Sequence, residues 1–480
     1  MNDVEVFKGQ FIYTRELTPP PQFETVRFGD YFLHHDPHLP IAIHDKGILL
    51  GHALDWRFPE KTYADILADL TQGAFNDAAM HSNRLSGRWA LILPGPVVIG
   101  DGGGTLSIVW NENSIGSSAA LLAYCNPTLK RKRRPDYEAH RLNGWHSGFA
   151  FFATDTEIEG VKALLPNHVL DKGTVRRFYP TARLPKRTIT DSAPRMGQIM
   201  RGSLAAAANR APLAIGLTSG YDSRLIAAAA PETGAVFFTM QDGHACPEGH
   251  ADIEGAKTIA GLLGMQHAVH VATGSESLRI NARQSEAMQA ERFEDWAAVS
   301  QDFKRICISG WASEVGRDYM AWPGSEYAEL RDILNCAGVH RFSELHGEAQ
   351  VWLGEAKDVS TRFGIKVIDL LYWELRVGRW ISAAFNILNQ GEWWMTPYTC
   401  REMFEAMLAV PSKERGYHGR RLYLAAIGHM NPELAKLPVT PLALRERLTL
   451  LRSHHLSRAV ARALDTLGLL RRLRRLRARA

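Results

Sequence analysis

The sequence lacks the motifs that mark the most common phosphate-binding and nucleophilic sites. It contains no G-x-x-x-x-G-K-[ST] segment, so a Walker-type phosphate loop is excluded. A hydrolase elbow, G-x-S-x-G, is also missing at Ser219, because Gly216 lies three residues before that serine rather than two. The sequence therefore indicates neither a P-loop NTPase nor an α/β-hydrolase.

Cysteines and long apolar runs are scarce too. The five cysteines are odd in number and form no C-x-x-C pair, which is typical of reduced thiols in a cytosolic protein. We find no initial apolar segment of the signal type and no run of 18 apolar residues, so we expect neither secretion nor a membrane span. The length of 480 residues and the 45% hydrophobic content predict a cytoplasmic protein of several domains.

Positive charge is concentrated at the C-terminal end. The net charge is +5, but the last ten residues, Arg471 to Ala480, hold six arginines and no acid, so the rest of the chain is nearly neutral. A neutral body argues against a general nucleic-acid surface. Leucines and arginines interleave over residues 441–480, which predicts a basic amphipathic helical tail suited to a membrane surface or an acidic partner. A solvated end without a partner is the alternative.

The most informative stretch is residues 213–226, where an apolar strand runs into a turn of small residues and then into a helix. The strand Leu213 to Leu217 is followed by Thr218-Ser219-Gly220, and a helix is expected from about Asp222. Small side chains let backbone N–H groups approach an anion, and the helix directs the positive end of its dipole to the same point. The stretch predicts an anion site. An ordinary turn with Asp222 or Ser223 as the helix N-cap is the alternative.

The segment Thr218-Ser219-Gly220-Tyr221-Asp222-Ser223 resembles the pyrophosphate loop S-G-G-x-D-S of the asparagine-synthetase-like ATP pyrophosphatases. It departs at its first two positions, where Thr218 keeps a hydroxyl and Ser219 gives up some of glycine's backbone freedom. The resemblance implies bound ATP, with Asp222 holding Mg²⁺. Such a site needs open amides around Gly220 and an Asp222 carboxylate that faces a cavity.

Three later segments occur in the order that this family uses. The strand Ala235 to Thr239 corresponds to the one beside the adenine, and the helix from Asp252 to the Leu263-Gly264 end resembles the family's D-x-x-x-A helix, although packing alone also explains its apolar stripe. Residues 308–319 resemble S-G-x-G-A-D-E-x-x-G-G-Y. The resemblance implies nucleotide contacts at Leu217, Thr218, Ser219, Gly220, Asp222, Ser223, Phe238, Thr239, Ser309 and Gly310.

The second acidic position of the implied metal site is altered. Ser313 stands where the family has aspartate, which leaves Glu314 as the nearest acid to share Mg²⁺ with Asp222. A solvated glutamate after a strand is the alternative. Further on, the resemblance implies that Glu392 lies near the acceptor chemistry and that Arg420 or Lys413 steadies the departing pyrophosphate. Basic residues on exposed helices usually have no catalytic part, and arginine is no simple substitute for lysine.

The front of the chain resembles the glutaminase domain that precedes the synthetase domain in asparagine synthetases. This resemblance rests on three sequence segments, at residues 85–92, 99–104 and 160–170. The chain starts Met-Asn-Asp-Val and its first cysteine is Cys125, so we expect no N-terminal nucleophile and no glutaminase activity. The amine then arrives as ammonia or within a substrate, as in the β-lactam synthetases. Lasso-peptide cyclases share the synthetase domain.

Together these features predict an α/β protein. We expect a β-rich sandwich of the N-terminal-nucleophile type at 1–180, an adenine-nucleotide α-hydrolase-like parallel sheet with a helical C-terminal half at 190–440, and the basic tail at 441–480. The function implied is an ATP-dependent, AMP-forming amide ligase that activates a carboxylate for attack by ammonia or a substrate amine. An intramolecular cyclase and a degenerate, non-catalytic binding protein are the alternatives. The sequence specifies neither the substrates nor the oligomeric state.

Overall fold

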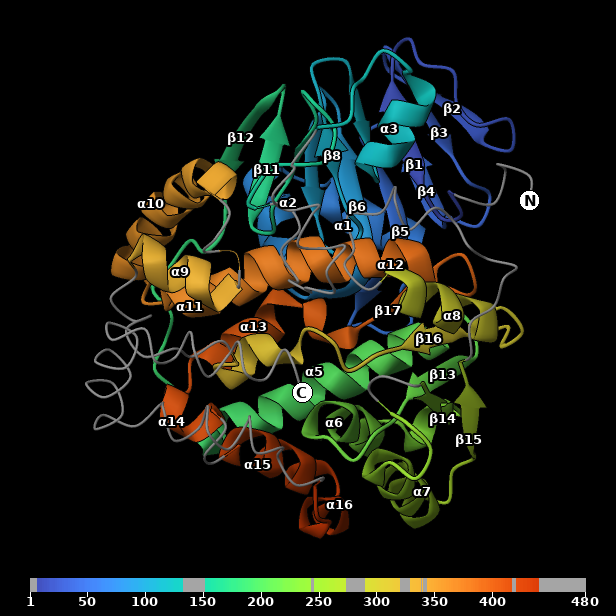
Figure 1. Cartoon of the computed structure of the whole chain (residues 1–480), viewed down its shortest axis with the longest axis vertical. Coiled ribbons are helices and arrows are strands. Elements are labelled where there is room, and N and C mark those ends of the chain that lie inside the picture. The colour runs from blue at the N-terminus through green and yellow to red at the C-terminus, as the bar shows by residue number, and fades with distance from the viewer. Residues whose placement is uncertain are drawn as a thin grey trace.

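The computed structural model describes residues 7–132, 152–242, 246–272, 290–319, 329–337, 339, 343–416 and 420–439. Antiparallel sheets from the first part of the chain lie in the upper half of Figure 1, and one parallel sheet lies in the lower half. A long helical segment crosses between them. The basic tail predicted at 441–480 lies outside the described residues.

Two six-stranded antiparallel sheets form the N-terminal part. The first has the order β10-β8-β9-β1-β3-β2, and the second has the order β12-β11-β7-β6-β5-β4. The first contains β1 (Phe11–Thr14), β2 (Glu24–Phe28), β3 (Tyr31–His35), β8 (Val109–Trp110), β9 (Ser114–Gly116) and β10 (Lys162–Ala163). The second contains β4 (Ile41–His44), β5 (Gly47–Asp55), β6 (Leu85–Leu93), β7 (Val97–Gly100), β11 (His168–Asp171) and β12 (Thr174–Arg177).

The two sheets pack face to face as a sandwich. Phe11 and Leu33 of one sheet share a buried cluster with Leu50 and Ile92 of the other, as expected for sheets whose inward residues interdigitate. Helices α1 (Tyr63–Leu70) and α2 (Phe75–Ser82) contribute to a second buried cluster with the β4–β7 sheet, and α3 (Ala119–Cys125) contributes to a third with β1 and β8. The β-rich sandwich is therefore confirmed.

The parallel sheet has five strands in the order β15-β14-β13-β16-β17. They are β13 (Leu213–Gly216), β14 (Val236–Gln241), β15 (His267–Val271), β16 (Ile306–Ile308) and β17 (Trp394–Met395). All four neighbouring pairs are parallel. The chain proceeds outward from β13 to β15, then returns to place β16 on the other side of β13. The strand order therefore reverses between β13 and β16, and open α/β sheets bind ligands outside the carboxyl ends of the strands at such a point.

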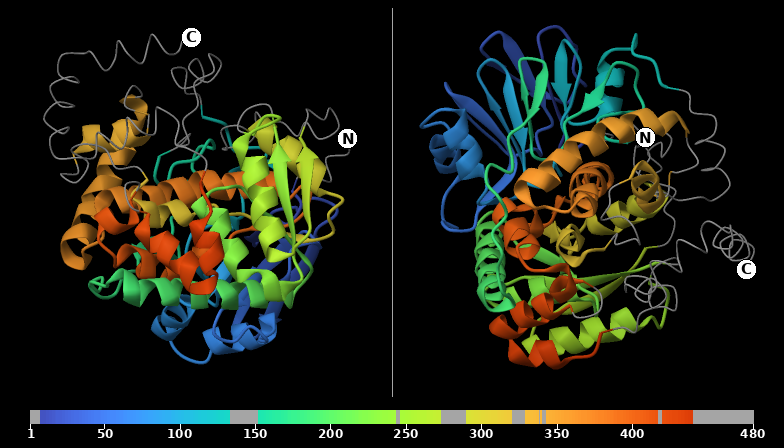
Figure 2. Two further views of the ribbon diagram at one scale, coloured as in Figure 1. Left: turned by 90° about the horizontal axis from the view of Figure 1, so that it is seen from below. Right: turned by 90° about the vertical axis from the view of Figure 1, so that its left-hand side faces the viewer.

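Helices surround this sheet and make up most of the C-terminal half (Figure 2). Those before β16 are α5 (Ile189–Ala208), α6 (Tyr221–Ala229), η2 (Pro231–Thr233), α7 (Ala251–Leu263) and α8 (Ala290–Ser300). Those after it are η5 (Ser313–Arg317), α9 (Leu330–Ala337), η7 (Ser343–Leu345), α10 (His346–Phe363), α11 (Val367–Leu370), the π-helix η8 (Leu371–Ile381), α12 (Ser382–Leu388), η9 (Pro397–Thr399), α13 (Arg401–Leu408), α14 (Ser412–Arg415), α15 (Arg421–Met430) and α16 (Pro432–Lys436). A mixed α/β fold with a helical C-terminal half is confirmed.

A capping box marks the start of α5 at Ile189. Thr188 accepts from the Asp191 amide, while the Asp191 carboxylate accepts from the Thr188 amide. Pro194 lies inside this helix, although proline has no amide hydrogen to donate.

The sandwich and the helical half are joined by buried polar contacts. Arg177 of β12 donates from Nη1 and Nη2 to the Glu374 carboxylate of η8, at 2.5 and 3.0 Å. The Trp373 indole donates to the Gly102 carbonyl at 2.6 Å, in the turn after β7. Among the described helices, none has both the length and the apolar character that a membrane crossing requires.

Candidate functional site

The loop 217–220 and the segment Ser309-Gly310 meet at the point where the strand order reverses. The loop follows β13 and leads into α6, whereas Ser309-Gly310 follows β16, the neighbouring parallel strand. Gly310 makes the close approach possible, because a Cβ atom placed there would lie 3.1 Å from the Ser223 amide nitrogen and 3.2 Å from Asp222 Cβ. The structure therefore brings together Leu217, Thr218, Ser219, Gly220, Asp222, Ser223, Ser309 and Gly310.

The loop amides themselves are not open, which corrects the expectation that they form the phosphate cradle. The Ser219 amide donates to Asp252 Oδ1 at 3.1 Å, and the Gly220 amide donates to Thr218 Oγ1 at 3.2 Å. The Thr218 amide donates to Ser223 Oγ at 3.1 Å. The Asp252 carboxylate, at the start of α7, thus occupies one place at which a phosphate oxygen was expected.

The first turn of α6 is the part of this segment that can receive an anion. Its N-cap is Gly220, with no capping side chain, so the alternative in which Asp222 or Ser223 caps the helix is wrong. The first backbone bond of the helix runs from the Arg224 amide to the Gly220 carbonyl, at 3.2 Å. The amides of Tyr221, Asp222 and Ser223 precede it and have no acceptor within the helix. They carry the positive end of its dipole.

A cluster of charged side chains lies beside this turn. Arg317 of η5 donates from Nη1 to Asp222 Oδ2 at 3.1 Å and from Nη2 to Glu314 Oε1 at 3.2 Å. The other Asp222 oxygen, Oδ1, accepts from the Ser313 hydroxyl. Burial raises the pKa of Glu314, the Arg317 charge lowers it and the Asp222 charge raises it, with a net increase. The guanidinium is thus the cation that holds the two carboxylates together.

These residues do not fit a bound Mg²⁺ as they are arranged. Mg²⁺ takes oxygen ligands in a nearly regular octahedron, but both Asp222 oxygens are engaged and Arg317 lies between the two carboxylates. Across the described residues, no three His, Cys, Asp or Glu side chains gather in a group that could hold a metal ion. The metal site expected at Asp222 and Glu314 stays a prediction, one that this arrangement of side chains does not favour. Ser313 stands at the position where the resembled sequence pattern has an aspartate.

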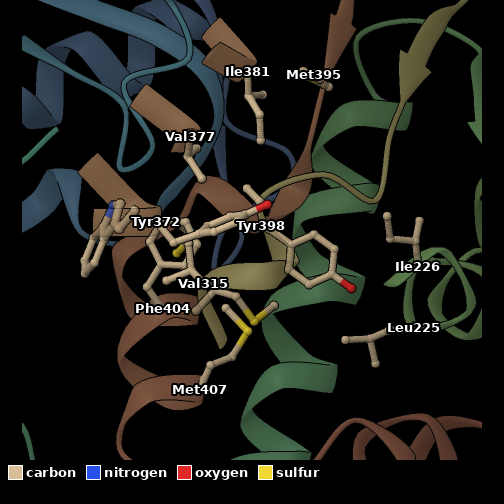
Figure 3. Close-up of a cluster of buried hydrophobic side chains, with 14 of the residues drawn as sticks. Leu225, Ile226, Val315, Tyr372, Val377, Ile381, Met395, Tyr398, Phe404 and Met407 are labelled. Atoms are coloured by element: carbon tan, nitrogen blue, oxygen red, sulfur yellow. The ribbon is translucent and has the colours of Figure 1, made fainter. Parts of the chain in front are cut away.

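Two buried tyrosines hold the loops of the site in place. The Tyr398 hydroxyl donates to the Asp222 carbonyl at 2.8 Å, and the Tyr423 hydroxyl donates to the Ser313 carbonyl at 2.6 Å. Burial raises the pKa of both phenols well above the usual value, so both remain donors. Both tyrosines belong to the buried cluster that also contains Val315 and Met407. Figure 3 shows part of this cluster, including Tyr398.

The two residues expected beside the adenine, Phe238 and Thr239, are buried and turn in different directions. Thr239 is next to the loop, because its hydroxyl donates to the Leu217 carbonyl at 2.7 Å. Phe238 faces away from the loop, with its ring 5.2 Å from that of Phe303. It lines a cavity of 430 Å³, together with Ala214, Val236, Phe237, Gln266, His267, Ala268, His270, Phe303 and Arg305. Since Ala214 and Val236 lie near the beginnings of their strands, this cavity is distinct from the loop site.

Glu392 lies away from the loop site, so the structure does not bring it together with Asp222, and its part in the chemistry stays a prediction. Glu392 precedes β17, and its carboxylate accepts from the Lys304 amide, which precedes β16, at 2.8 Å. Both residues lie at the amino edge of the parallel sheet, whereas Ser309 lies at the carboxyl edge. The altered spacing between Glu392 and Pro397 is the physical reason, because a whole strand separates them.

The two basic candidates have different surroundings. Arg420 is 9% exposed, and its guanidinium carbon lies 4.8 Å from the centre of the Tyr221 ring, so it is at the start of α6. Lys413 is exposed on α14, a helix of four residues whose buried member is Arg415. Arg415 is held by the Asp369 carboxylate, with Nη1 to Oδ1 at 3.3 Å. The structure therefore places Arg420, but not Lys413, against the anion-receiving turn.

The site contains two arginines that the sequence analysis did not select. Arg317 bridges the two acids, and the charge of Arg376, on η8, lowers the pKa of Glu314. Arg376 lies over the Trp380 ring at 3.5 Å and, among the described residues, has no carboxylate partner. Arg317 follows Glu314 by one helical turn, a spacing that could have indicated an ion pair. The position of Arg376 depends on how a distant helix packs, and no local signal predicts it.

Comparisons with known proteins give little more. No family model matches the chain, and no curated protein matches it. One solved structure that matches is NMN synthetase from Francisella tularensis, with 14% sequence identity over 54% of this chain and 100% of that chain. Its TM-score of 0.19 is too low for the likeness to support a fold or a function. Evidence for the function therefore comes from the sequence and the site.

Proposed function

We propose that the protein binds an adenine nucleotide at the carboxyl edge of its parallel sheet and uses it to activate a carboxylate. One observation carries this proposal: the start of α6, which has no capping side chain, lies beside Ser309-Gly310 at the point where the strand order reverses. Three arginines, Arg317, Arg376 and Arg420, belong to the same site. Ser309 is 6% exposed, and its hydroxyl has no hydrogen-bond partner among the described residues. A buried polar group without a partner is costly unless a ligand satisfies it.

The chemistry proposed is that of an AMP-forming amide ligase. A carboxylate oxygen of the substrate attacks the α-phosphorus of ATP, and pyrophosphate leaves. An amine then attacks the acyl carbon, and AMP leaves as the amide bond forms. The α6 amides would receive phosphate oxygens, while Arg376 and Arg420 offset the charge that develops on pyrophosphate. Asparagine-synthetase-like adenylation is proposed from the sequence resemblance and the site together.

The test is ATP-dependent pyrophosphate release with a panel of carboxylates, in the wild type and in Asp222→Ala. We expect the substitution to abolish release, because Asp222 orients Arg317 and Ser313 at the helix start. Asp358→Ala is the matched control, since Asp358 is 61% exposed on α10 and pairs with Arg362 of the same helix. Release by Asp222→Ala at the wild-type rate would refute the assignment.

A second function, that of a non-catalytic binding protein, is favoured by one specific observation. Side chains of this chain already satisfy the amides of Thr218, Ser219 and Gly220. A loop that no longer needs a ligand to satisfy its amides is compatible with lost catalysis. ATP consumption that depends on an added carboxylate would exclude this function, whereas ATP binding without turnover on every carboxylate would favour it.

A further inference from the structure

We infer that Arg317 takes the place of a divalent cation, so that this site binds the phosphate chain of its nucleotide without a metal ion. This inference rests on the proposed nucleotide site. It explains how two carboxylates can lie next to the start of α6, where a phosphate is expected to bind. Asp222 and Glu314 would repel a triphosphate unless a cation lies between them and offsets their charge.

The Arg317 guanidinium lies between the two carboxylates. Arg317 contacts one carboxylate with each of its terminal nitrogens, at 3.1 and 3.2 Å. Its side chain is 10% exposed, and those of Asp222 and Glu314 are 21% and 17% exposed, so the charges interact with little screening by water. A planar guanidinium has five N–H donors and can contact carboxylate and phosphate oxygens together.

The surrounding residues hold this arrangement in place. The Ser313 hydroxyl donates to Asp222 Oδ1, and Arg317 contacts Asp222 Oδ2. Arg317 also lies within η5, which Tyr423 fixes through the Ser313 carbonyl at 2.6 Å. A metal ion at Asp222 would have to displace both Ser313 and Arg317. Ser313 stands where the resembled pattern has a carboxylate, so the site has one negative charge fewer than that pattern. This is consistent with Arg317, rather than a metal ion, as the cation of the site.

The experiment measures binding by calorimetry for two ligands: ATP, and inorganic tripolyphosphate as a probe without adenine. Each titration is made once with Mg²⁺ and once with EDTA, at about 5 mM, which is ample for a site of micromolar affinity. For the wild type we expect dissociation constants in the two buffers that agree within about threefold. Arg317→Met should weaken binding in EDTA by about tenfold or more, the effect of losing one charge-assisted hydrogen bond. In that variant, Mg²⁺ should restore part of the affinity, because the two carboxylates have lost their cation.

Arg317→Lys is the second variant, since lysine keeps the positive charge but lacks the planar, forked N–H donors of the guanidinium. It should retain metal-independent binding at reduced affinity, and its melting temperature reports whether the fold persists. Wild-type binding of ATP that is more than tenfold weaker in EDTA would overturn the inference and leave the proposed function standing. Failure of both ligands to bind in either buffer would overturn both proposals. Metal-independent binding of tripolyphosphate that ATP does not share would support the cation and refute the adenine site.

Discussion

Ser219 packs directly against Gly255, across the gap between the loop and α7. A Cβ atom placed on Gly255 would lie 2.5 Å from Ser219 Cβ and 3.1 Å from its Cα. Ser219 stands where the resembled loop has glycine, and the missing side chain at Gly255 provides room for it. The same contact keeps the Ser219 amide facing Asp252, at the start of that helix.

Gly255→Ala should therefore destabilise the protein and disturb the loop. Overpacking of this kind costs about 1–3 kcal/mol, which exceeds the ~1 kcal/mol that alanine gains over glycine within a helix. We expect a lower melting temperature and weaker ATP binding. Gly261→Ala is the matched control, because it lies on the same helix with nothing within 4 Å of its added Cβ, and it should be neutral or stabilising.

The double variant Ser219→Gly/Gly255→Ala tests whether the two positions interact. Removal of the serine side chain relieves the closest contact, so the double variant should recover part of the loss. Purely additive effects in thermal unfolding would show that the two sites are independent and would contradict the packing argument.

Glu392→Gln should leave nucleotide binding and pyrophosphate release within about twofold of the wild type. Glutamine keeps a carbonyl oxygen that can accept from the Lys304 amide, so the contact at the amino edge of the sheet survives. A loss of activity by tenfold or more with unchanged ATP affinity would place Glu392 in the chemistry after all. Steady-state kinetics of the two proteins provides the comparison.

The sequence predicted those parts of the fold that local patterns encode. The strand–turn–helix at 213–226 and the helix ending at Gly264 were correct because apolar periodicity and a left-handed glycine, with φ of 63° at Gly264, specify them locally. The π-helix Leu371–Ile381 could not be foreseen, since its backbone is fixed by packing against the sandwich through Trp373 and Glu374.

The site was predicted only in part, for a related reason. Position and residue type located Asp222, Ser309 and Gly310, but the use of their polar groups depends on partners that are distant in sequence. Asp252 is 33 residues from Ser219, and Arg317 comes from the loop that follows a different strand. Motif spacing alone cannot show whether an amide that could receive a phosphate already has a partner.

Arg224→Lys should lower stability and loosen the loop. Arg224 donates from Nη2 to the Ser219 carbonyl at 2.6 Å and to the Pro438 carbonyl at 2.7 Å, and from Nη1 to the Leu437 carbonyl at 2.7 Å. A lysine cannot span these acceptors, so we expect a loss of about 2 kcal/mol in the free energy of unfolding. Denaturant titration measures it. An unchanged midpoint would show that the C-terminal segment does not brace the loop.

The contact between the sandwich and the helical half should weaken in acid. Burial acts to raise the pKa of Glu374, but the charge of Arg177 and hydrogen bonds outweigh it and lower that pKa. Burial also acts to raise the pKa of Glu355, but the hydrogen bond and charge of His168, followed by those of Arg177, lower it to about 2. A carboxyl whose pKa is lower in the folded than in the unfolded protein stabilises the fold at pH values above its unfolded pKa. This contribution is therefore complete above about pH 4.3 and is lost as the pH falls towards 2.

Glu374→Gln isolates this effect. At pH 7 it should cost about 3 kcal/mol, because it leaves the buried Arg177 without its fully buried partner. The difference in melting temperature between variant and wild type should shrink as the pH falls below about 4, because the Glu374 carboxyl is then protonated in the unfolded wild type and, at still lower pH, in the folded one as well. Glu254→Gln, at an exposed pair with Lys257, is the control and should change the melting temperature little at any pH. A difference that stays constant from pH 7 to pH 3 would mean that the ionised carboxylate does not stabilise the contact.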